Sequence, residues 1–198
     1  MQTIANKILK HATSLSEGTP LVAKELLHLG GRAAIDQALS RLVKRGLLLR
    51  ASRGIYVLPV TSRFGTRAPS SSKVAEGIAM LRGETIVQHG AAAANALGLT
   101  TQVPIKSIYL TSGPNRRLRL GAQTVEFRHA PVWQLALAGR PAGEVVRALA
   151  WLGPTKAGTA LRKLRPTLQS SELAEVASIR ARVPGWMARE LSSLLVHG

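Results

Sequence analysis

Residues 19–59 read TPLVAKELLHLGGRAAIDQALSRLVKRGLLLRASRGIYVLP, and we expect this stretch to decide the fold. The segment 32–45 is its most regular part, because apolar residues recur in it with helical spacing. The members of this predicted buried face are Ile35, Ala38, Leu39, Leu42 and Val43. Gly46 is the kind of residue that commonly ends a helix. The pattern therefore predicts an amphipathic helix over 32–45.

Shorter elements flank this helix on both sides. Apolar spacing predicts a first helix over Thr3–Ser14, and Thr19-Pro20 is a typical start for a second, short helix. After Gly46, the runs 47–50 and 55–58 are strand-like and are joined by a glycine-containing turn. Three helices followed by a two-stranded hairpin is the element order of a winged helix-turn-helix. We therefore expect a DNA-binding domain of this type over residues 1–60.

The rest of the chain has a different composition. Residues 61–72 read TSRFGTRAPSSS, which is polar and has no apolar period, so we interpret them as an interdomain linker. Residues 73–198 combine alternating, strand-like segments at 105–111 and 123–128 with helical patterns further on. The predicted fold class is α+β: an N-terminal winged helix-turn-helix and a mixed α/β C-terminal domain with a small sheet and C-terminal helices.

The charge of the chain favours a polyanionic partner. Lys and Arg number 27 against 10 Asp and Glu, giving a formal net charge of +17. Residues 1–70 hold 11 basic and 3 acidic side chains. Neutralising phosphates releases counterions, so a strongly basic folded protein binds nucleic acid at least non-specifically. The chain has no cysteine, which excludes disulfides and thiolate sites, and Asp36 is its single aspartate.

Polar side chains on the predicted third helix and hairpin are the candidate DNA contacts. Gln, Ser, Arg and Lys can read base edges or hold phosphates. Taken alone, the same polar residues are also typical of a helix face that is simply exposed to solvent. In a winged helix-turn-helix, however, this helix has the position that recognises DNA. The candidate residues are Arg32, Gln37, Ser40, Arg41, Lys44 and Arg45 on the helix, Arg50, Ser52 and Arg53 in the hairpin, and Arg63 and Arg67 in the linker.

A second basic cluster lies in the C-terminal segment. Arg116, Arg117 and Arg119 follow Pro114 and Asn115, in what we interpret as a turn. Three arginines in a turn are able to hold phosphates of nucleic acid or an acidic partner, and an ordinary exposed turn gives the same pattern.

Three segments resemble a known family. They are residues 19–59, residues 62–76 (SRFGTRAPSSSKVAE) and residues 84–104 (ETIVQHGAAAANALGLTTQVP). The chain resembles the AbiEi-like antitoxins of type IV toxin–antitoxin systems over roughly residues 1–150. The most specific parts are Gly54-Ile55-Tyr56-Val57 and the stretch 93–101. The resemblance implies an N-terminal winged helix that represses its own operon, and a C-terminal domain needed to neutralise a nucleotidyltransferase-like toxin.

The expected function is therefore that of a DNA-binding transcriptional autorepressor and type IV antitoxin. We expect it to bind double-stranded DNA at an inverted repeat in its own operon, as a monomer in solution with two copies on DNA. The toxin is its expected functional partner, and direct contact with the toxin stays open. No signal peptide or membrane-spanning run is evident, so we expect a cytoplasmic protein with no membrane partner.

Two alternatives come from other function classes. One is a nucleic-acid-processing enzyme such as a nuclease, with His89 or His129 beside Glu84 or Glu126. The chain has no HExxH, P-loop or GxSxG spacing, and residues 73–198 contain no aspartate. We therefore expect no enzyme, no catalytic residue, no metal and no cofactor. The other alternative is a winged-helix adaptor whose second domain only binds a protein.

Overall fold

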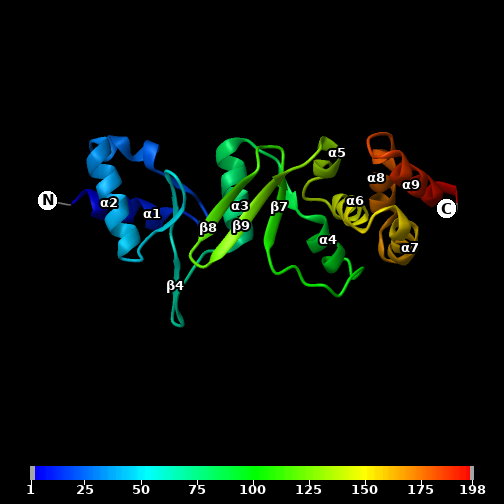
Figure 1. Ribbon diagram of the computed structural model, residues 1–198, viewed down its shortest axis with the longest axis horizontal. Helices are drawn as coiled ribbons and strands as arrows, with labels where there is room; N and C mark the ends of the chain where they lie inside the picture. Colours follow the sequence, from blue (N-terminus) through cyan, green and yellow to red (C-terminus); the bar gives the residue numbers. More distant parts are fainter. Residues whose placement is uncertain (1–2, 197–198) are drawn as a thin grey trace. The chain divides into compact units, whose positions relative to one another are not determined.

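The computed structural model describes residues 3–196 of the chain, and their side chains as far as residue 193. Helices and strands are interspersed as far as β9, and the described residues after β9 form helices (Figure 1). The elements are α1 (Ile4–Ser14), β1 (Leu21–Val22), η1 (Ala23–Leu29, a 3₁₀ helix), α2 (Arg32–Lys44), β2 (Leu49–Ser52), β3 (Ile55–Val57), β4 (Val60–Ser62), β5 (Gly65–Arg67), α3 (Ser71–Arg82), β6 (Ile86–Gln88), α4 (Gly90–Ala96), β7 (Ser107–Thr111), β8 (Arg116–Leu120), β9 (Gln123–His129), α5 (Val132–Leu135), α6 (Pro141–Leu152), α7 (Pro154–Leu164), η2 (Arg165–Thr167), α8 (Ser170–Ser178), η3 (Ile179–Ala181) and α9 (Gly185–Val196).

The chain divides into two compact units, and each is discontinuous in sequence. The first consists of Met1–Glu84 and Arg116–Glu126, and the second of Thr85–Asn115 and Phe127–Gly198. The sequence predicted domains of 1–60 and 73–198 instead. The difference arises because α3 and the β8–β9 hairpin pack with the N-terminal elements. This packing joins residues that are far apart in the sequence, so no local pattern predicts it.

The first part of the N-terminal unit is built around α1, η1 and α2. Their apolar faces meet in one core, and α1 lies against α2. Burying side chains of this kind stabilises by about 1.5–3 kcal/mol each, which is what holds such short elements together. The fully or nearly buried members of this core are Ile8, Ala12, Leu21, Ala23, Leu26, Ile35, Ala38, Leu39, Leu42, Leu48 and Tyr56.

A three-stranded antiparallel sheet in the order β1-β3-β2 completes this part. Leu21 of β1 pairs with Tyr56, and Leu49 of β2 pairs with Val57. The prediction that Thr19-Pro20 begins a helix is wrong. The chain first forms β1, because Leu21 and Val22 bond to β3, and only then winds into η1.

Residues 61–72 are structured, so the prediction of an irregular linker is wrong for them. They contain most of an antiparallel hairpin, β4 with β5, and the start of α3. The chain then returns to the α1–β1 loop. A Cβ added to Gly18 would lie 2.5 Å from the carbonyl carbon of Lys73, and one added to Gly77 would lie 2.7 Å from the oxygen of Gly18. Only glycines allow the two backbones to approach this closely.

The remaining sheet has the strand order β6-β7-β9-β8. Within the N-terminal unit, β8 lies against β2. Within the second unit, β6 pairs with β7 in antiparallel register, with Val87 opposite Leu110. The rings of Tyr109 and Phe127 stack with their centroids 5.9 Å apart.

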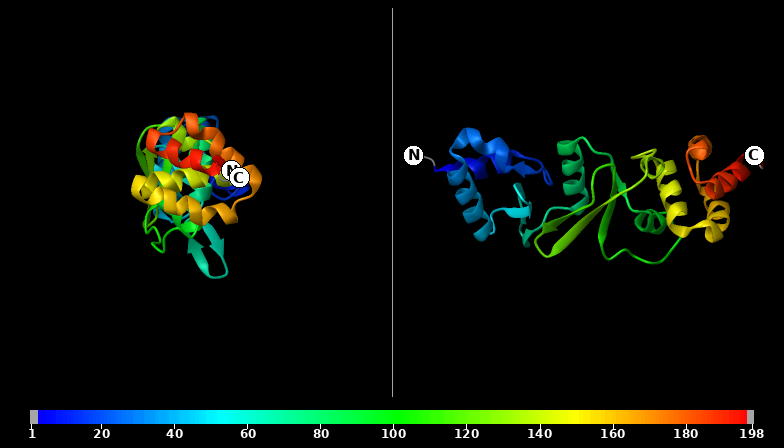
Figure 2. Two further views of the ribbon diagram at one scale, coloured as in Figure 1. Left: turned by 90° about the vertical axis from the view of Figure 1, so that its right-hand side faces the viewer. Right: turned by 45° about the horizontal axis from the view of Figure 1, so that its top comes forward.

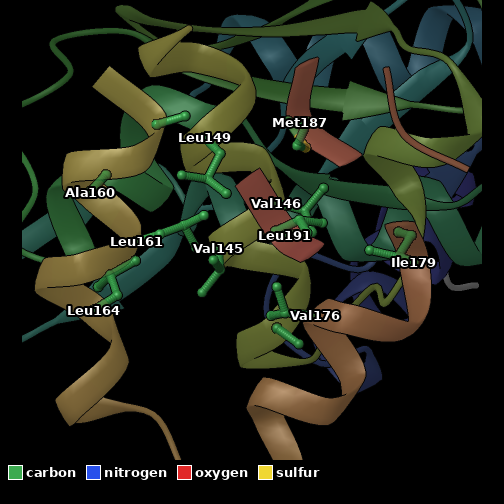
Figure 3. Packing of buried hydrophobic residues seen from close by; sticks show 12 residues of the cluster. Val145, Val146, Leu149, Ala160, Leu161, Leu164, Val176, Ile179, Met187 and Leu191 are labelled. Atoms are coloured by element: carbon green, nitrogen blue, oxygen red, sulfur yellow. The ribbon is translucent and has the colours of Figure 1, made fainter. Parts of the chain in front are cut away.

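The C-terminal helices form the core of the second unit. Side chains from α6, α7, α8, η3 and α9 converge in it (Figure 3). α4 packs on α6, where Gly90 allows a close approach: an added Cβ would lie 2.3 Å from the oxygen of Arg147. Figure 2 gives two further views of these elements. The predicted α+β class is confirmed as a mixed fold of helices and small sheets.

Candidate nucleic-acid interface

The helix α2 is amphipathic as the sequence predicts. Ile35, Ala38, Leu39 and Leu42 are buried. The opposite side presents polar side chains that are all exposed: Gln37, Ser40, Arg41 and Lys44. Small residues, Ala33 and Ala34, occupy the first turn and are exposed as well. This face therefore combines hydrogen-bonding groups, two positive charges and a low steric profile near its N-terminus.

The ends of α2 differ in charge. Its N-cap is Gly31, and no side chain caps the first turn by a hydrogen bond. The Nε of Arg32 lies 3.0 Å from a carboxylate oxygen of Asp36, so part of the Arg32 charge is neutralised within the helix. At the other end Arg45 is the C-cap and is exposed. Of these two arginines, Arg45 is the better placed to meet an anion.

An open groove runs between the start of α1 and the polar face of α2. Its volume is about 600 Å³. Four of the predicted DNA contacts line it: Gln37, Arg41, Lys44 and Arg45. Thr3 and Asn6 of the α1 end also line it, and the hydroxyl of Thr3 accepts a hydrogen bond from the Asn6 N–H. Amides, a hydroxyl and positive charges line the groove together with apolar side chains such as Ile4, Ala38 and Leu42. The polar and charged groups are the ones that suit a phosphodiester backbone.

The β2–β3 hairpin carries the next predicted contacts. Arg50 and Arg53 are exposed, whereas Ser52 is half-buried. Gly54 has a φ of +73° and makes the tight turn possible. Its carbonyl oxygen accepts a hydrogen bond from the Ala23 N–H at 2.9 Å, which fixes the hairpin tip to the start of η1.

The β4–β5 hairpin carries Arg63 and Arg67, and the two have different surroundings. Arg63 lies at the tip, with its guanidinium carbon 4.6 Å from the ring centroid of Phe64. Arg67 lies at the base, where Nη1 is 3.3 Å from Glu17. Arg67 therefore serves the structure of the hairpin, and Arg63 is the one that faces outward.

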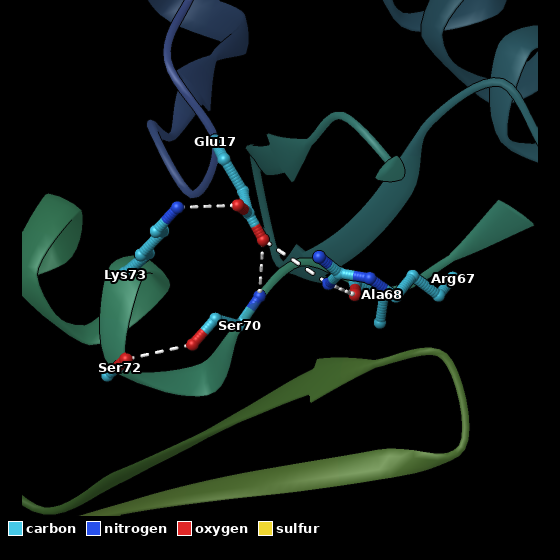
Figure 4. Close-up of polar contacts among 6 residues, drawn as sticks. All are labelled: Glu17, Arg67, Ala68, Ser70, Ser72 and Lys73. Carbon is cyan, nitrogen blue, oxygen red and sulfur yellow. Dashed lines mark hydrogen bonds and ion pairs between the residues drawn. The ribbon is translucent and has the colours of Figure 1, made fainter. Parts of the chain in front are cut away.

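Glu17 organises this hairpin base (Figure 4). Its carboxylate accepts hydrogen bonds from the Ser70 N–H at 3.0 Å and from the Nζ of Lys73 at 2.6 Å, besides its contact with Arg67. These donors, Lys73 foremost, lower the pKa of Glu17 from 4.5 to about 2. The side chain stays ionised at neutral pH and joins the α1–β1 loop to the beginning of α3.

The second basic cluster lies on a strand, so the predicted turn is wrong for Arg116, Arg117 and Arg119. They belong to β8, where alternate side chains point to opposite faces. Arg116 points inward and makes two contacts with Glu84, at 3.0 and 2.5 Å. Arg117 and Arg119 are exposed, and Arg117 lies 3.5 Å from Glu126. Arg116 is thus a structural residue, and the exposed pair lies on a strand that packs with β2.

The two histidines of the enzyme alternative make structural contacts. The Nδ1 of His89 accepts a hydrogen bond from the Ala91 N–H and so caps α4. Burial lowers the pKa of His89, and the charge of Arg128 lowers it further. The ring of His129 bonds to the oxygen of Gly113 at 3.0 Å. Over residues 3–193, no group of three or more His, Cys, Asp or Glu side chains is arranged to hold a metal ion.

A protein-family model with the description "Family of unknown function (DUF6088)" matches residues 7–175. The chain belongs to this family. A search of the curated proteins finds no match. Among solved structures, the chain is similar to the RV2827C protein from Mycobacterium tuberculosis, with 19% identity and a TM-score of 0.50. That similarity covers 99% of this chain and 77% of the other, and it concerns the fold alone.

In this DUF6088 chain, no described helix is long and apolar enough to cross a membrane. Two residues that shape or mark the candidate site were not predicted from the sequence. Glu17 gave no signal, because its partners lie 50 or more residues away in the chain. Phe64 did give a signal in the sequence, because a phenylalanine next to an arginine is unusual inside a polar segment. In the structure its side chain is 86% exposed.

Proposed function

We propose that the chain is a DNA-binding repressor of its own operon and a type IV antitoxin. The observation that carries the proposal is the exposed polar face of α2 beside the basic tip of the β2–β3 hairpin. In this proposal residues 1–60 act as a winged helix-turn-helix. The order α1, η1, α2 and hairpin supports that assignment, as does the shared core that α1, η1 and α2 form.

α2 is the proposed reading helix. Gln37 and Arg41 are exposed on the same face, one turn apart, and carry the groups that bond to base edges in a major groove. Arg to guanine and Gln to adenine are among the specific pairings that such side chains make. The small Ala33 and Ala34 let the helix N-terminus approach the duplex closely.

The hairpin and the helix end are the proposed phosphate contacts. Arg53 at the hairpin tip and Arg45 at the end of α2 are exposed. The hydrogen bond from Ala23 to Gly54 holds the hairpin in place before DNA arrives, which reduces the entropy lost on binding. These positions therefore supply affinity, whereas α2 supplies sequence preference.

The antitoxin half of the proposal rests on the resemblance to AbiEi-like antitoxins. In this half, the C-terminal part of the chain is needed to neutralise a nucleotidyltransferase-like toxin. In the DNA-binding half, two copies of the chain bind an inverted repeat, because one winged helix reads only a short half-site. A growth assay with the toxin expressed tests neutralisation. Rescue by the full chain is the expected result, and cells that stay arrested with the full chain present would overturn the antitoxin half.

The DNA-binding half is tested by fluorescence anisotropy, with a duplex from the region upstream of the gene and a scrambled duplex. Arg41→Ala should weaken binding to the upstream duplex by about 1–3 kcal/mol and affect the scrambled one less. Arg53→Ala should weaken both equally and lower the salt slope by about 1.

Arg189→Ala is the charge-matched control, because Arg189 is exposed on α9, in the other unit. It should leave the binding of both duplexes unchanged. If Arg41→Ala binds the upstream duplex as tightly as Arg189→Ala does, α2 is not the reading helix.

A further inference from the structure

The β4–β5 hairpin is a polar arm with an aromatic residue at its tip. All residues from Thr61 to Arg67 are exposed. The hairpin projects away from α1, α2 and α3 of its own unit in Figure 1 and in the left view of Figure 2. It has no apolar core of its own, so packing does not explain why a phenylalanine stands there.

Phe64 is far more exposed than the other aromatic residues. The chain has 2 Phe, 2 Tyr and 3 Trp. Phe127, Tyr56 and Tyr109 are buried, and Trp151 is 38% exposed, whereas Phe64 is 86% exposed. Leaving this ring in water forfeits the free energy of burying it, about 1.5–3 kcal/mol. A partner that covers the ring would recover it.

The arm is rigid enough to present this tip. Ser62 pairs with Gly65, so Arg63 and Phe64 form a two-residue turn. The hydroxyl of Ser62 accepts a hydrogen bond from the Phe64 N–H at 3.2 Å and donates one to the Gly65 oxygen at 3.3 Å. At the other end, the contacts of Glu17 with Arg67 and Lys73 hold the base (Figure 4).

The dimensions and chemistry of the tip match the minor groove of DNA. Strands of three residues extend about 10 Å, and the minor groove is about 7.5 Å deep. Arginines bond to the acceptors on the groove floor, and apolar side chains such as Phe insert between base pairs and kink the duplex. Here Arg63 and Phe64 are adjacent, with the guanidinium carbon 4.6 Å from the ring centroid.

We propose that the β4–β5 hairpin is a second DNA-binding arm: Arg63 enters the minor groove, and Phe64 wedges between two base pairs and bends the duplex. This inference rests on the proposed DNA-binding function. Arg63 places a positive charge on one side of the ring, and Gly65 has no side chain on the other side. A charged neighbour and an open approach suit stacking on the bases of a nucleic acid better than contact with an apolar protein surface. The bend would distinguish this chain from a winged helix that leaves its site straight.

The test uses the full chain and the upstream duplex. Energy transfer between dyes on the two duplex ends measures bending, and permanganate reactivity of thymines reports unstacked base pairs wherever they occur. Wild type should bend the duplex and expose one or more thymines. Phe64→Ala should bind about tenfold more weakly, bend less and lose the reactive thymines, whereas Phe64→Trp should keep them. Val132→Ala, which removes an 81% exposed apolar side chain in the other unit, is the control.

The outcomes separate the two proposals. If wild type binds neither duplex, the DNA-binding function fails and the arm fails with it. If wild type binds and Phe64→Ala matches it in affinity, bend and permanganate pattern, the arm proposal is overturned and the function stands. If Phe64→Ala behaves normally on DNA but no longer rescues cells from the toxin, the tip contacts a protein, which also overturns the proposal.

Discussion

Gly77 is the position where one added methyl group tests the packing of the N-terminal unit. It lies inside α3, opposite the loop that carries Glu17. In Gly77→Ala, the new Cβ would lie 2.7 Å from the backbone oxygen of Gly18 and 2.8 Å from the Cδ of Pro20. Neither atom belongs to a flexible side chain, so α3 or the loop must shift.

The magnitude follows from two opposing terms. Overpacking of this kind costs about 1–3 kcal/mol, and the rigid neighbours place Gly77→Ala in the upper half of that range. Replacing Gly by Ala inside a helix stabilises the folded state by about 1 kcal/mol, because Ala loses less conformational freedom on folding. The expected net loss is therefore about 1–2 kcal/mol in the free energy of unfolding.

Gly158→Ala is the matched control in α7. Its new Cβ would lie 2.7 Å from the Oε2 of Glu190, the far end of a side chain that can rotate away. The steric term is then small, and the variant should gain about 0.5–1 kcal/mol. The two substitutions are chemically identical and should have opposite signs.

Urea unfolding measures both effects. All three tryptophans, Trp133, Trp151 and Trp186, belong to the second unit, so their fluorescence follows that unit and circular dichroism must follow the first. With a slope of about 2 kcal/mol per molar urea, Gly77→Ala should lower the midpoint by roughly 0.5–1 M. A Gly77→Ala protein as stable as wild type would refute the close approach of α3 to the Gly18 turn.

Three more predictions concern single groups. The pKa of Glu17 is lowered from 4.5 to about 2, so its ionised form stabilises the fold above pH 4.5 and this contribution is lost as the pH falls toward 2. Urea unfolding at several pH values should show that Glu17→Gln lacks this component and that Glu25→Gln keeps it; equal profiles would contradict the assignment. Leu149→Ala, at a fully buried site, should cost about 2–5 kcal/mol in the fluorescence-detected transition, and a smaller loss would mean that the core closes around the cavity. Arg117→Ala with Arg119→Ala should weaken binding to any duplex and lower the salt slope by about 2, with stability within about 0.5 kcal/mol of wild type; an unchanged slope would show that β8 takes no part in the proposed DNA contact.

The parts of the fold that the sequence predicts are those encoded by local patterns. α2 follows from the spacing of Ile35, Leu39 and their neighbours, and the β2–β3 hairpin follows from its two apolar runs and glycine turn. β1 was missed because a two-residue strand has no period of its own. It exists because Leu21 and Val22 bond to β3, more than 30 residues later.

The candidate site shows the same division. Gln37, Ser40, Arg41 and Lys44 are exposed as predicted, because the helical period fixes which face is buried. Arg116 was predicted to belong to a basic turn able to hold an anionic partner, and it lies in β8 instead, where Glu84, a residue 32 positions earlier, binds it. The β4–β5 hairpin lies in a segment whose composition alone reads as a linker, and its base depends on the distant Glu17. Pairings across such distances carry no local signal.

The division of the N-terminal unit into Met1–Glu84 and Arg116–Glu126 affects synthesis on the ribosome. The core that contains Ile8, Leu39 and Tyr56 is complete once residue 58 has emerged from the exit tunnel. The face that receives β8 stays uncovered until residue 126 has emerged, several seconds later at about 5–20 residues per second. The nascent chain therefore displays α2 before the unit is closed, and a ribosome that stalls between these points leaves the face that receives β8 open to chaperones and proteases.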